Sequence, residues 1–290
     1  MPAKPQPAFP AGFCFTLQSE SAIIIKDSIL FTEDSGINER QFDHKGGVYR
    51  QGRPAYPPAL FACLQSAGLL APTDIAADVG AGTGIFSRQL AAYVGKVYAV
   101  EPNDDMRAVM QADVALSPLC GSAESIPLPD CSVDVITAAQ AFHWFDPAAF
   151  RAECLRLLRP NGRVLLIWNV RDEASPLIAE NYAVNRQYCP CFRGFSNGLD
   201  FTDATFRSFF GGDYQPISLD YPQLYNREAF VLRSLSSSFA PAPQEDGYAA
   251  YRAALEKLFD AYCQDGTVAY PYITRCYAGR LYTADTNDKS

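Results

Sequence analysis

Short apolar runs alternate with amphipathic stretches along the central part of this 290-residue chain. Apolar runs of strand length predict buried strands, and apolar residues spaced three and four apart predict helices. The predicted strands are 75–79, 96–101, a weaker one near 115–117, 133–138 and 163–169. The predicted helices between them are 84–93, 103–112 and 147–158. This alternation predicts right-handed βαβ crossovers, and therefore an α/β fold with a doubly wound, mostly parallel sheet.

Three further helices and two further strands are predicted outside this region. The helical patterns are 57–68, which Gly68 ends, 176–188 and 245–263. The strand patterns are 214–222 and 267–281. Because both strand patterns follow the alternating region, we expect an antiparallel pair that closes one edge of the sheet.

The domain boundaries follow from where these patterns begin. Residues 1–37 are rich in proline, which opposes regular structure, so we expect an N-terminal appendage that is partly disordered. Residues 38–290 are expected to form one domain. Its core would be 75–170, and residues 171–290 would supply the sheet edge and part of a helical cover.

Composition narrows the possible partners. The net charge of −8 and the isoelectric point near 4.8 oppose a phosphate-binding surface, so nucleic acid is not expected as a partner. The nine cysteines contain no C-x-x-C pair, which favours free thiols in a reducing compartment and no metal site. No apolar run reaches the roughly 18 residues of a membrane helix. We therefore expect a cytoplasmic protein without a membrane partner, and its oligomeric state is unknown.

The segment from Asp78 to Gly84, Asp-Val-Gly-Ala-Gly-Thr-Gly, carries the strongest chemical signal. Its glycines permit a sharp turn and let a ligand approach the backbone closely. A phosphate-binding P-loop would need a lysine after the glycines, and none follows. A dinucleotide loop would need a third glycine at a position that Ile85 or Ser87 occupies. Glu101, about 20 residues after the glycines, ends the next strand and suits the two hydroxyls of a ribose.

The remaining interpretation of the turn is an acid-x-G-x-G-x-G motif, which resembles motif I of class I S-adenosylmethionine-dependent methyltransferases. Between residues 75 and 170, four further segments resemble that family in their order and spacing. They are the acid Glu101, Gly121-Ser-Ala-Glu124 with Ile126-Pro-Leu-Pro-Asp130, Val133 to Trp144, and Leu158 to Ile167. Upstream, the segment from Tyr49 to Pro57 resembles a subgroup of small-molecule methyltransferases akin to trans-aconitate methyltransferases. The resemblance implies a seven-stranded, Rossmann-like methyltransferase fold.

The resemblance also implies which residues would bind S-adenosylmethionine and its product S-adenosylhomocysteine. Backbone around Gly80 and Gly82 would lie against the methionine part. Asp78 would hold the amino group through water or fix the loop, and Glu101 would bind the ribose. The complete implied set is Asp78, Gly80, Ala81, Gly82, Gly84, Glu101, Pro102, Met106, Ala123, Glu124 and Gln140. Of these, Met106, Ala123 and Glu124 would border the adenine, and Gln140 would lie beside the sulfonium.

The implied reaction is methyl transfer to a small-molecule acceptor at O, N or C, and the acceptor itself is not identified by the sequence. His143 is the candidate general base if the acceptor must lose a proton, with packing beside Trp144 as the alternative. Tyr49, Arg53 and Tyr56 are candidates for holding an anionic acceptor or closing a lid, and Trp144 for lining its pocket. Two other functions stay open: a nicotinamide-dependent oxidoreductase, and a non-catalytic protein that binds S-adenosylmethionine.

Overall fold

The computed structural model describes residues 55–195, 201–212, 214–237 and 239–282. In these residues a seven-stranded sheet has the order β3-β2-β1-β4-β5-β9-β6. Its strands are β1 (Ile75–Val79), β2 (Lys96–Val100), β3 (Leu116–Leu119), β4 (Val133–Ala139), β5 (Leu158–Arg171), β6 (Gln215–Asp220) and β9 (Tyr272–Gly279). β1 to β5 pair in parallel, and β9 lies antiparallel between β5 and β6. The predicted doubly wound, mostly parallel seven-stranded sheet is confirmed.

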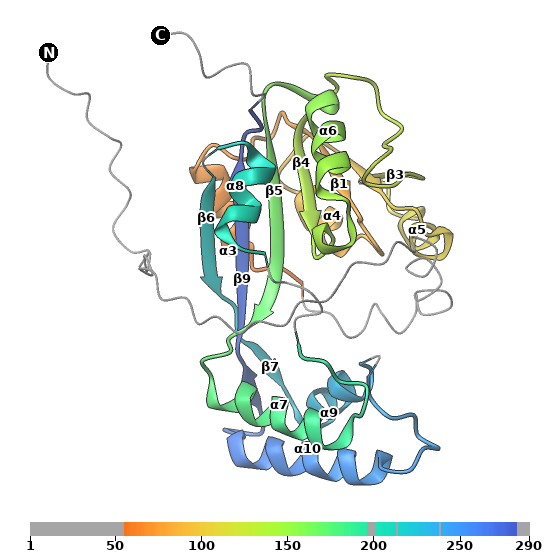
Figure 1. Cartoon of the computed structure of the whole chain (residues 1–290), viewed down its shortest axis with the longest axis vertical. Helices are drawn as coiled ribbons and strands as arrows, with labels where there is room; N and C mark the ends of the chain where they lie inside the picture. The colour runs from red at the N-terminus through yellow and green to blue at the C-terminus, as the bar shows by residue number, and fades with distance from the viewer. Residues whose placement is uncertain (1–54, 196–200, 213, 238, 283–290) are drawn as a thin grey trace, which may run out of the picture.

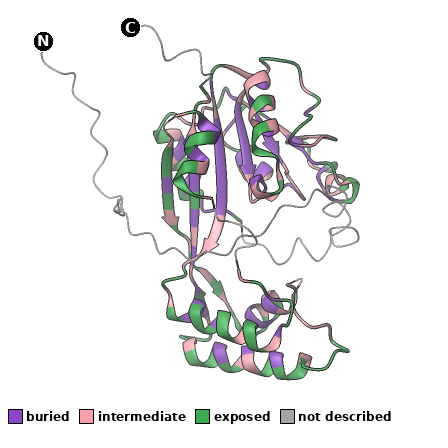
Figure 2. Cartoon of the chain, in the orientation of Figure 1, coloured by how far each residue is buried: buried purple, intermediate pink, exposed green. Residues whose placement is uncertain are grey.

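Helices cover both faces of this sheet (Figure 1). The elements on or beside it are α3 (Pro58–Ser66), α4 (Ile85–Leu90), α5 (Asp104–Met110), the short 3-10 helix η1 (Phe142–Trp144), α6 (Pro147–Leu157) and α8 (Asp203–Phe210). Apolar residues of α3 and α4 form one buried cluster with one face of the sheet. Residues of α6 and α8 form a second cluster with the other face. In Figure 2 the strands between these two layers are largely buried.

A smaller lobe lies beyond the ends of β4 and β5 and has a core of its own (Figure 1). It contains α7 (Pro176–Tyr188), β7 (Gln223–Tyr225), α9 (Arg227–Leu235), α10 (Tyr248–Tyr262) and β8 (Val268–Tyr270). β7 and β8 pair as a separate antiparallel sheet. The chain enters this lobe after β5 and returns from it into β9, so these two strands connect the sheet to the lobe.

The structure corrects two of the predicted strands. Residues 267–281 were expected to be one strand, but Pro271 separates β8 from β9, and the two strands belong to different sheets. β5 is longer than the predicted 163–169 because the chain stays extended from Leu158, with a register shift against β4. Within this irregularity Asn161 has a φ of +70°.

Some expectations lie outside the described residues. The appendage at 1–37 and the segment that contains Tyr49 and Arg53 are among them. In the described part of the chain, no helix is long and apolar enough to cross a membrane. Within the same ranges, no group of three or more His, Cys, Asp or Glu side chains is placed to hold a metal ion.

Candidate functional site

The glycine loop follows β1 at the carboxyl end of the parallel strands. β1 pairs with β2 on one side and with β4 on the other. Chain order along the sheet reverses between β1 and β4, and such a switch point leaves a crevice where α/β proteins bind ligands. The loop therefore lies where the topology alone predicts a ligand.

The three glycines share one type of backbone conformation but differ in what surrounds them. All have positive φ, +69° at Gly80, +58° at Gly82 and +80° at Gly84. A Cβ at Gly80 would lie 2.6 Å from the Cβ of Ala141, and one at Gly84 would lie 2.8 Å from the Met110 side chain. A Cβ at Gly82 would meet nothing within 4 Å. Gly80 and Gly84 are therefore packed against the protein, whereas Gly82 faces open space.

Hydrogen bonds to the end of β2 hold the loop in place. The backbone N–H groups of Gly80 and Ala81 both donate to the carbonyl oxygen of Val100, at 2.9 and 3.0 Å. The N–H of Gly82 donates to Oε2 of Glu101 at 2.8 Å, and the N–H of Asn103 donates to Oε1 at 3.0 Å. Each carboxylate oxygen has a second lone pair, so Glu101 retains the capacity to accept ligand hydroxyls.

Glu101 is buried, with 7% of its surface exposed. Burial raises the pKa of its carboxyl, while the hydrogen bonds from Asn103 and Gly82 act in the opposite direction. A desolvated acceptor beside an open face of the loop suits two neighbouring hydroxyl groups. The contact of Glu101 with a ribose stays a prediction.

Asp78 is buried at the start of the loop and holds it through contacts with α4 and β4. Its Oδ2 accepts a hydrogen bond from the Ser87 hydroxyl of α4, and its Oδ1 accepts one from the Thr137 hydroxyl of β4 at 2.7 Å. Burial raises the pKa of Asp78 to about 6, against the effect of these two hydroxyls, and nearby Glu101 adds to the increase. The side chain thus joins β1, α4 and β4. Of its two predicted roles, fixing the loop is the one that these contacts support.

A cavity of about 80 Å³ lies against the loop. It is lined by Tyr56, Asp78, Gly80, Ala81, Gly82, Thr83, Ile85, Phe86, Ala139 and Gln140. The hydroxyl oxygen of Thr83 is buried and has no hydrogen-bond partner among the described residues. Buried hydroxyls without partners are unusual and indicate a group that a ligand would satisfy. With the open face of Gly82, this atom makes the cavity a good fit for the polar methionine end of S-adenosylmethionine.

Gln140 closes the cavity at the end of β4. It has a φ of +59°, uncommon for a residue with a side chain, and such backbone strain is concentrated at functional sites. Its N–H donates to the carbonyl of Ile167 at 2.8 Å, and its Nε2 donates to the carbonyl of Asn169 at 2.9 Å. These bonds hold Gln140, which was predicted to lie beside the sulfonium, against β5.

The residues predicted around the adenine are not among those that line the cavity. Met106 is buried in α5, directly after Glu101, and Pro102 is exposed. Ala123 packs in the same buried cluster as Val100. Glu124 is exposed, and its Oε1 accepts a hydrogen bond from the N–H of Asp146 at 3.1 Å. Their contacts with adenine stay predictions.

His143 and Trp144 lie in η1, after Gln140, and are not part of the cavity lining. The indole N–H of Trp168 donates to Nδ1 of His143 over a long distance of 3.5 Å. Because an indole nitrogen can only donate, this contact favours the neutral imidazole with its proton on Nε2. Trp144 is 42% exposed and its ring lies 4.9 Å from that of His143.

Tyr56, predicted as an acceptor or lid residue, lies in the cavity lining and is almost fully buried. Its backbone N–H and C=O both bond to the amide of Gln89 in α4, at 2.9 and 2.8 Å. The Nδ2 of Asn169 donates to the carbonyl of Ala55 at 3.2 Å. Tyr56 is thus attached to the helix that follows the glycine loop.

The sequence interpretation missed several residues of this site. Thr83, Ile85, Phe86 and Ala139 line the cavity, and Ser87 and Thr137 hold Asp78. Thr83 could have been found, because it lies inside the motif between two assigned glycines. The contacts of Asn169 with Gln140 and Ala55 depend on tertiary structure and have no local signal.

Comparison with known proteins agrees with this geometry. Residues 77–166 match the family model described as a methyltransferase domain. An uncharacterized methyltransferase of Mycobacterium tuberculosis is 44% identical over 128 residues, which cover 44% of this chain and 51% of that protein. A methyltransferase-like protein of Schizosaccharomyces pombe is 37% identical over 132 residues, which cover 45% of this chain and 52% of that protein. The chain thus spans about half the length of these curated relatives.

A solved structure extends the likeness beyond the matched core. A protein described as a type II methyltransferase from Anaeromyxobacter dehalogenans is 27% identical, with a TM-score of 0.57. The match covers 80% of this chain and 99% of that chain. The family match spans the glycine loop, Glu101 and Gln140, which lie at the ends of β1, β2 and β4 of the seven-stranded sheet. The chain therefore contains a class I methyltransferase domain.

Proposed function

We propose that this protein transfers a methyl group from S-adenosylmethionine to a small-molecule acceptor, at an O, N or C atom. The observation that carries the proposal is the cavity beside the glycine loop, where Gly82 faces open space and the Thr83 hydroxyl is buried without a partner. A cavity that contains a polar atom without a hydrogen-bond partner and adjoins the backbone of the glycine loop is suited to a small polar ligand.

Glu101 and Thr83 would hold the ribose and the amino-acid end of the cofactor. The Glu101 carboxylate would accept hydrogen bonds from the ribose hydroxyls, while its bond to Gly82 keeps it aligned with the loop. The Thr83 hydroxyl would bond the amino-acid end. Asp78, which is bonded to Ser87 and Thr137, would act through the loop and not through the ligand.

When bound, S-adenosylmethionine supplies an electrophilic methyl group on a sulfonium that already contains its leaving group. The protein's part is to orient the acceptor for in-line attack and to exclude water, and such positioning contributes much of the rate. Gln140, fixed to β5 through Asn169 and Ile167, would form the wall between cofactor and acceptor.

His143 would act on the acceptor's proton where the acceptor has one to lose. As a base it must receive that proton on a ring nitrogen that is not protonated. Nδ1, which faces the indole N–H of Trp168, is the unprotonated nitrogen in the tautomer that this contact favours. We propose that His143 acts as a base only if Nδ1 exchanges its Trp168 partner for the acceptor.

The experiment is a methyl-transfer assay with labelled S-adenosylmethionine and a panel of small acids, amines, phenols and activated carbon acids. We expect label in at least one product, and loss of most of that activity in Glu101→Gln. The control is Glu173→Gln, which removes a carboxylate charge from an exposed residue that follows β5. This variant should retain activity. Binding of NADH in place of S-adenosylhomocysteine would favour the oxidoreductase. Cofactor binding without product from any acceptor class would favour a non-catalytic binding protein.

A further inference from the structure

Two arginines from different parts of the fold meet at Tyr270 in the smaller lobe. Arg171, the last residue of β5, donates from Nε to the hydroxyl of Tyr270 at 3.3 Å. The guanidinium of Arg233, from α9, lies 3.9 Å from the centre of the same ring. The Tyr270 hydroxyl in turn donates to Oδ1 of Asn181 at 2.9 Å, so it is fixed as an acceptor toward Arg171. One buried tyrosine therefore positions both cations.

Neither arginine has a carboxylate partner in the described part of the chain. Eight other arginines there form ion pairs with Asp or Glu: Arg88, Arg107, Arg156, Arg159, Arg163, Arg207, Arg227 and Arg252. The neighbours of Arg171 and Arg233 are instead aromatic rings. Two half-buried positive charges without a counterion are costly, and rings offset only part of that cost.

The hydrogen bonds of these two guanidinium groups are also poor. Arg233 donates to the hydroxyls of Tyr272 and Ser234 at 3.4 and 3.3 Å, and its buried Nε has no partner. The NH1 group of Arg171 reaches the carbonyl of Phe195 only at 3.5 Å. Bonds from a guanidinium to an anion are normally 2.7–2.9 Å, about the length found between Arg156 and Glu153. The cluster therefore has N–H donors that an anion would satisfy better than the protein does.

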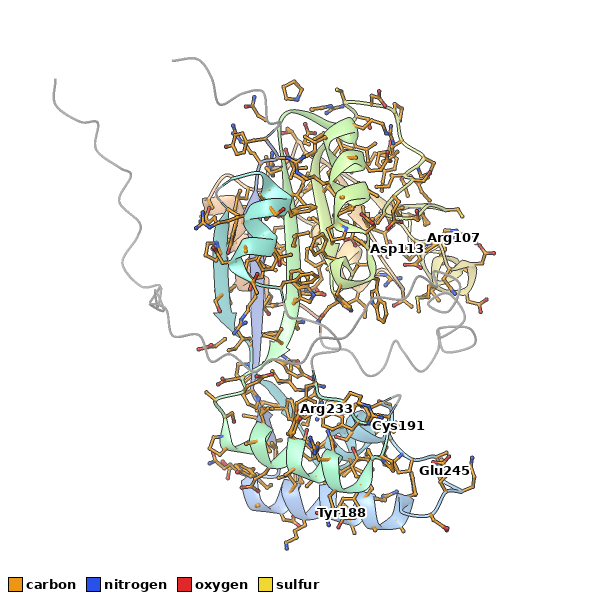
Figure 3. The ribbon with its side chains drawn as sticks, viewed as in Figure 1. Arg107, Asp113, Tyr188, Cys191, Arg233 and Glu245 are labelled. Carbon is orange, nitrogen blue, oxygen red and sulfur yellow. The ribbon has the colours of Figure 1, made fainter. Side chains whose placement is uncertain are left out.

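The cluster adjoins the proposed methyl-transfer site. Asn169, whose carbonyl accepts from Gln140, lies two residues before Arg171 on β5. Residues two apart on a strand share a face and are about 7 Å apart. The opposing residues on β9 are Thr274, which donates to Asn169, and Tyr272, which pairs in register with Arg171. In Figure 3, Arg233 lies in the part of the smaller lobe nearer the sheet.

We propose that Arg171 and Arg233 bind an anionic group of the methyl acceptor, a carboxylate or a phosphate, and so select acidic small molecules. The inference rests on the proposed methyl transfer, because it assigns the acceptor's place beside Gln140. Arg171 and Arg233 are each partly exposed as whole residues. Tyr270 acts as a positioning residue, because its hydroxyl accepts from Arg171 and its ring lies against Arg233.

The test uses the full chain and two probes, citrate and inorganic phosphate, titrated by calorimetry with and without S-adenosylhomocysteine. We expect saturable binding of at least one probe, and the tighter one identifies the class of anion. Arg171→Met and Arg233→Met should each weaken that binding at least about tenfold, since each removes charge-assisted hydrogen bonds. Arg233→Lys should keep part of it, because the charge remains.

Arg252→Met is the matched control, since Arg252 is in the same lobe and is paired with Glu256 on the exposed side of α10. It should bind the probe as the unsubstituted protein does. Circular dichroism checks the fold of each variant, and S-adenosylhomocysteine should bind all of them equally. No saturable binding of either probe, or equal binding by a folded Arg233→Met protein, overturns the inference while leaving methyl transfer standing. Probe binding without S-adenosylhomocysteine binding would instead overturn the assignment to a methyl acceptor.

Discussion

The backbone N–H of Gly82 donates to Oε2 of Glu101 at 2.8 Å, which joins the middle of the glycine loop to the acid at the end of β2. One bond thus sets the distance between the residue that faces open space and the residue proposed to bind the ribose. Because Asn103 holds the other oxygen of the same carboxylate, its orientation is fixed before any ligand arrives. Preorganised acceptors lose little conformational freedom on binding.

Replacement of Glu101 should weaken cofactor binding more than it changes the fold. Glu101→Gln keeps the size of the side chain but leaves one oxygen where the carboxylate has two, so either the Gly82 bond or the ribose contact is lost. We expect a loss of about 1–3 kcal/mol in the affinity for S-adenosylhomocysteine, measured by calorimetry. An unchanged dissociation constant would remove Glu101 from the binding site.

Asp78 should make folding stability depend on pH. Its pKa is about 6 in the folded protein and about 3.9 in an unfolded chain, so below pH 3.9 it is protonated in both states. As pH rises from about 4 to about 6, the unfolded chain releases this proton first. The stabilisation present at low pH is therefore lost across that window, by up to about 3 kcal/mol.

Urea denaturation of the unsubstituted protein and of Asp78→Asn measures this effect. The variant cannot ionise at this position, so its free energy of unfolding should fall less between pH 4 and pH 6 than that of the unsubstituted protein. At pH 7 it should be as stable as the unsubstituted protein or more so, since the amide can still bond to Ser87 and Thr137. The same pH dependence in both proteins would mean that Asp78 titrates near its ordinary pKa.

Alanine at Gly80 and at Gly82 should have different consequences. Both positions have positive φ, which costs a residue with a Cβ about 1–2 kcal/mol. Gly80→Ala adds a clash at 2.6 Å with Ala141, so its melting temperature should fall further. Gly82→Ala has no such clash but fills space beside the cavity, so its main defect should be in S-adenosylhomocysteine affinity. Equal losses of stability and affinity in the two variants would contradict these assignments.

His143 should affect turnover more than cofactor affinity. With an acceptor identified by the methyl-transfer assay, His143→Ala should lower kcat at least about tenfold and leave the dissociation constant of S-adenosylhomocysteine unchanged. The acidic limb of the pH-rate profile should also disappear. Trp168→Phe, which removes the donor to Nδ1, should retain that limb. A parallel loss of turnover and cofactor affinity in His143→Ala would indicate a structural role.

The core of the fold could be predicted because its signals are local. Strands 75–79 and 133–138 and the helix at 176–188 follow from apolar spacing, and the structure places them within about one residue. α8 was missed although Thr202 caps it, and its residues Phe206, Phe209 and Phe210 are buried against the sheet.

The site was predicted to the extent that it lies within one motif. Gly80, Gly82 and Gln140, which were predicted to bind the cofactor, line the cavity, and they come from segments with characteristic spacing. The positions of Arg171 and Arg233 around Tyr270 could not be predicted, because β5, α9 and β8 are distant in sequence. Nothing in the sequence near either arginine distinguishes it from those that form ion pairs on the surface.

The most direct measurement is a calorimetric titration of S-adenosylhomocysteine into the full-length protein and into Gly82→Val. We predict one saturable site per chain, and its loss in the variant, whose side chain would fill the space that Gly82 leaves open. The control for backbone strain is Gly68→Val. Gly68 also has positive φ and open space around it, but it lies away from the loop. No binding at millimolar concentration, or undiminished binding by a folded Gly82→Val protein, would contradict the account.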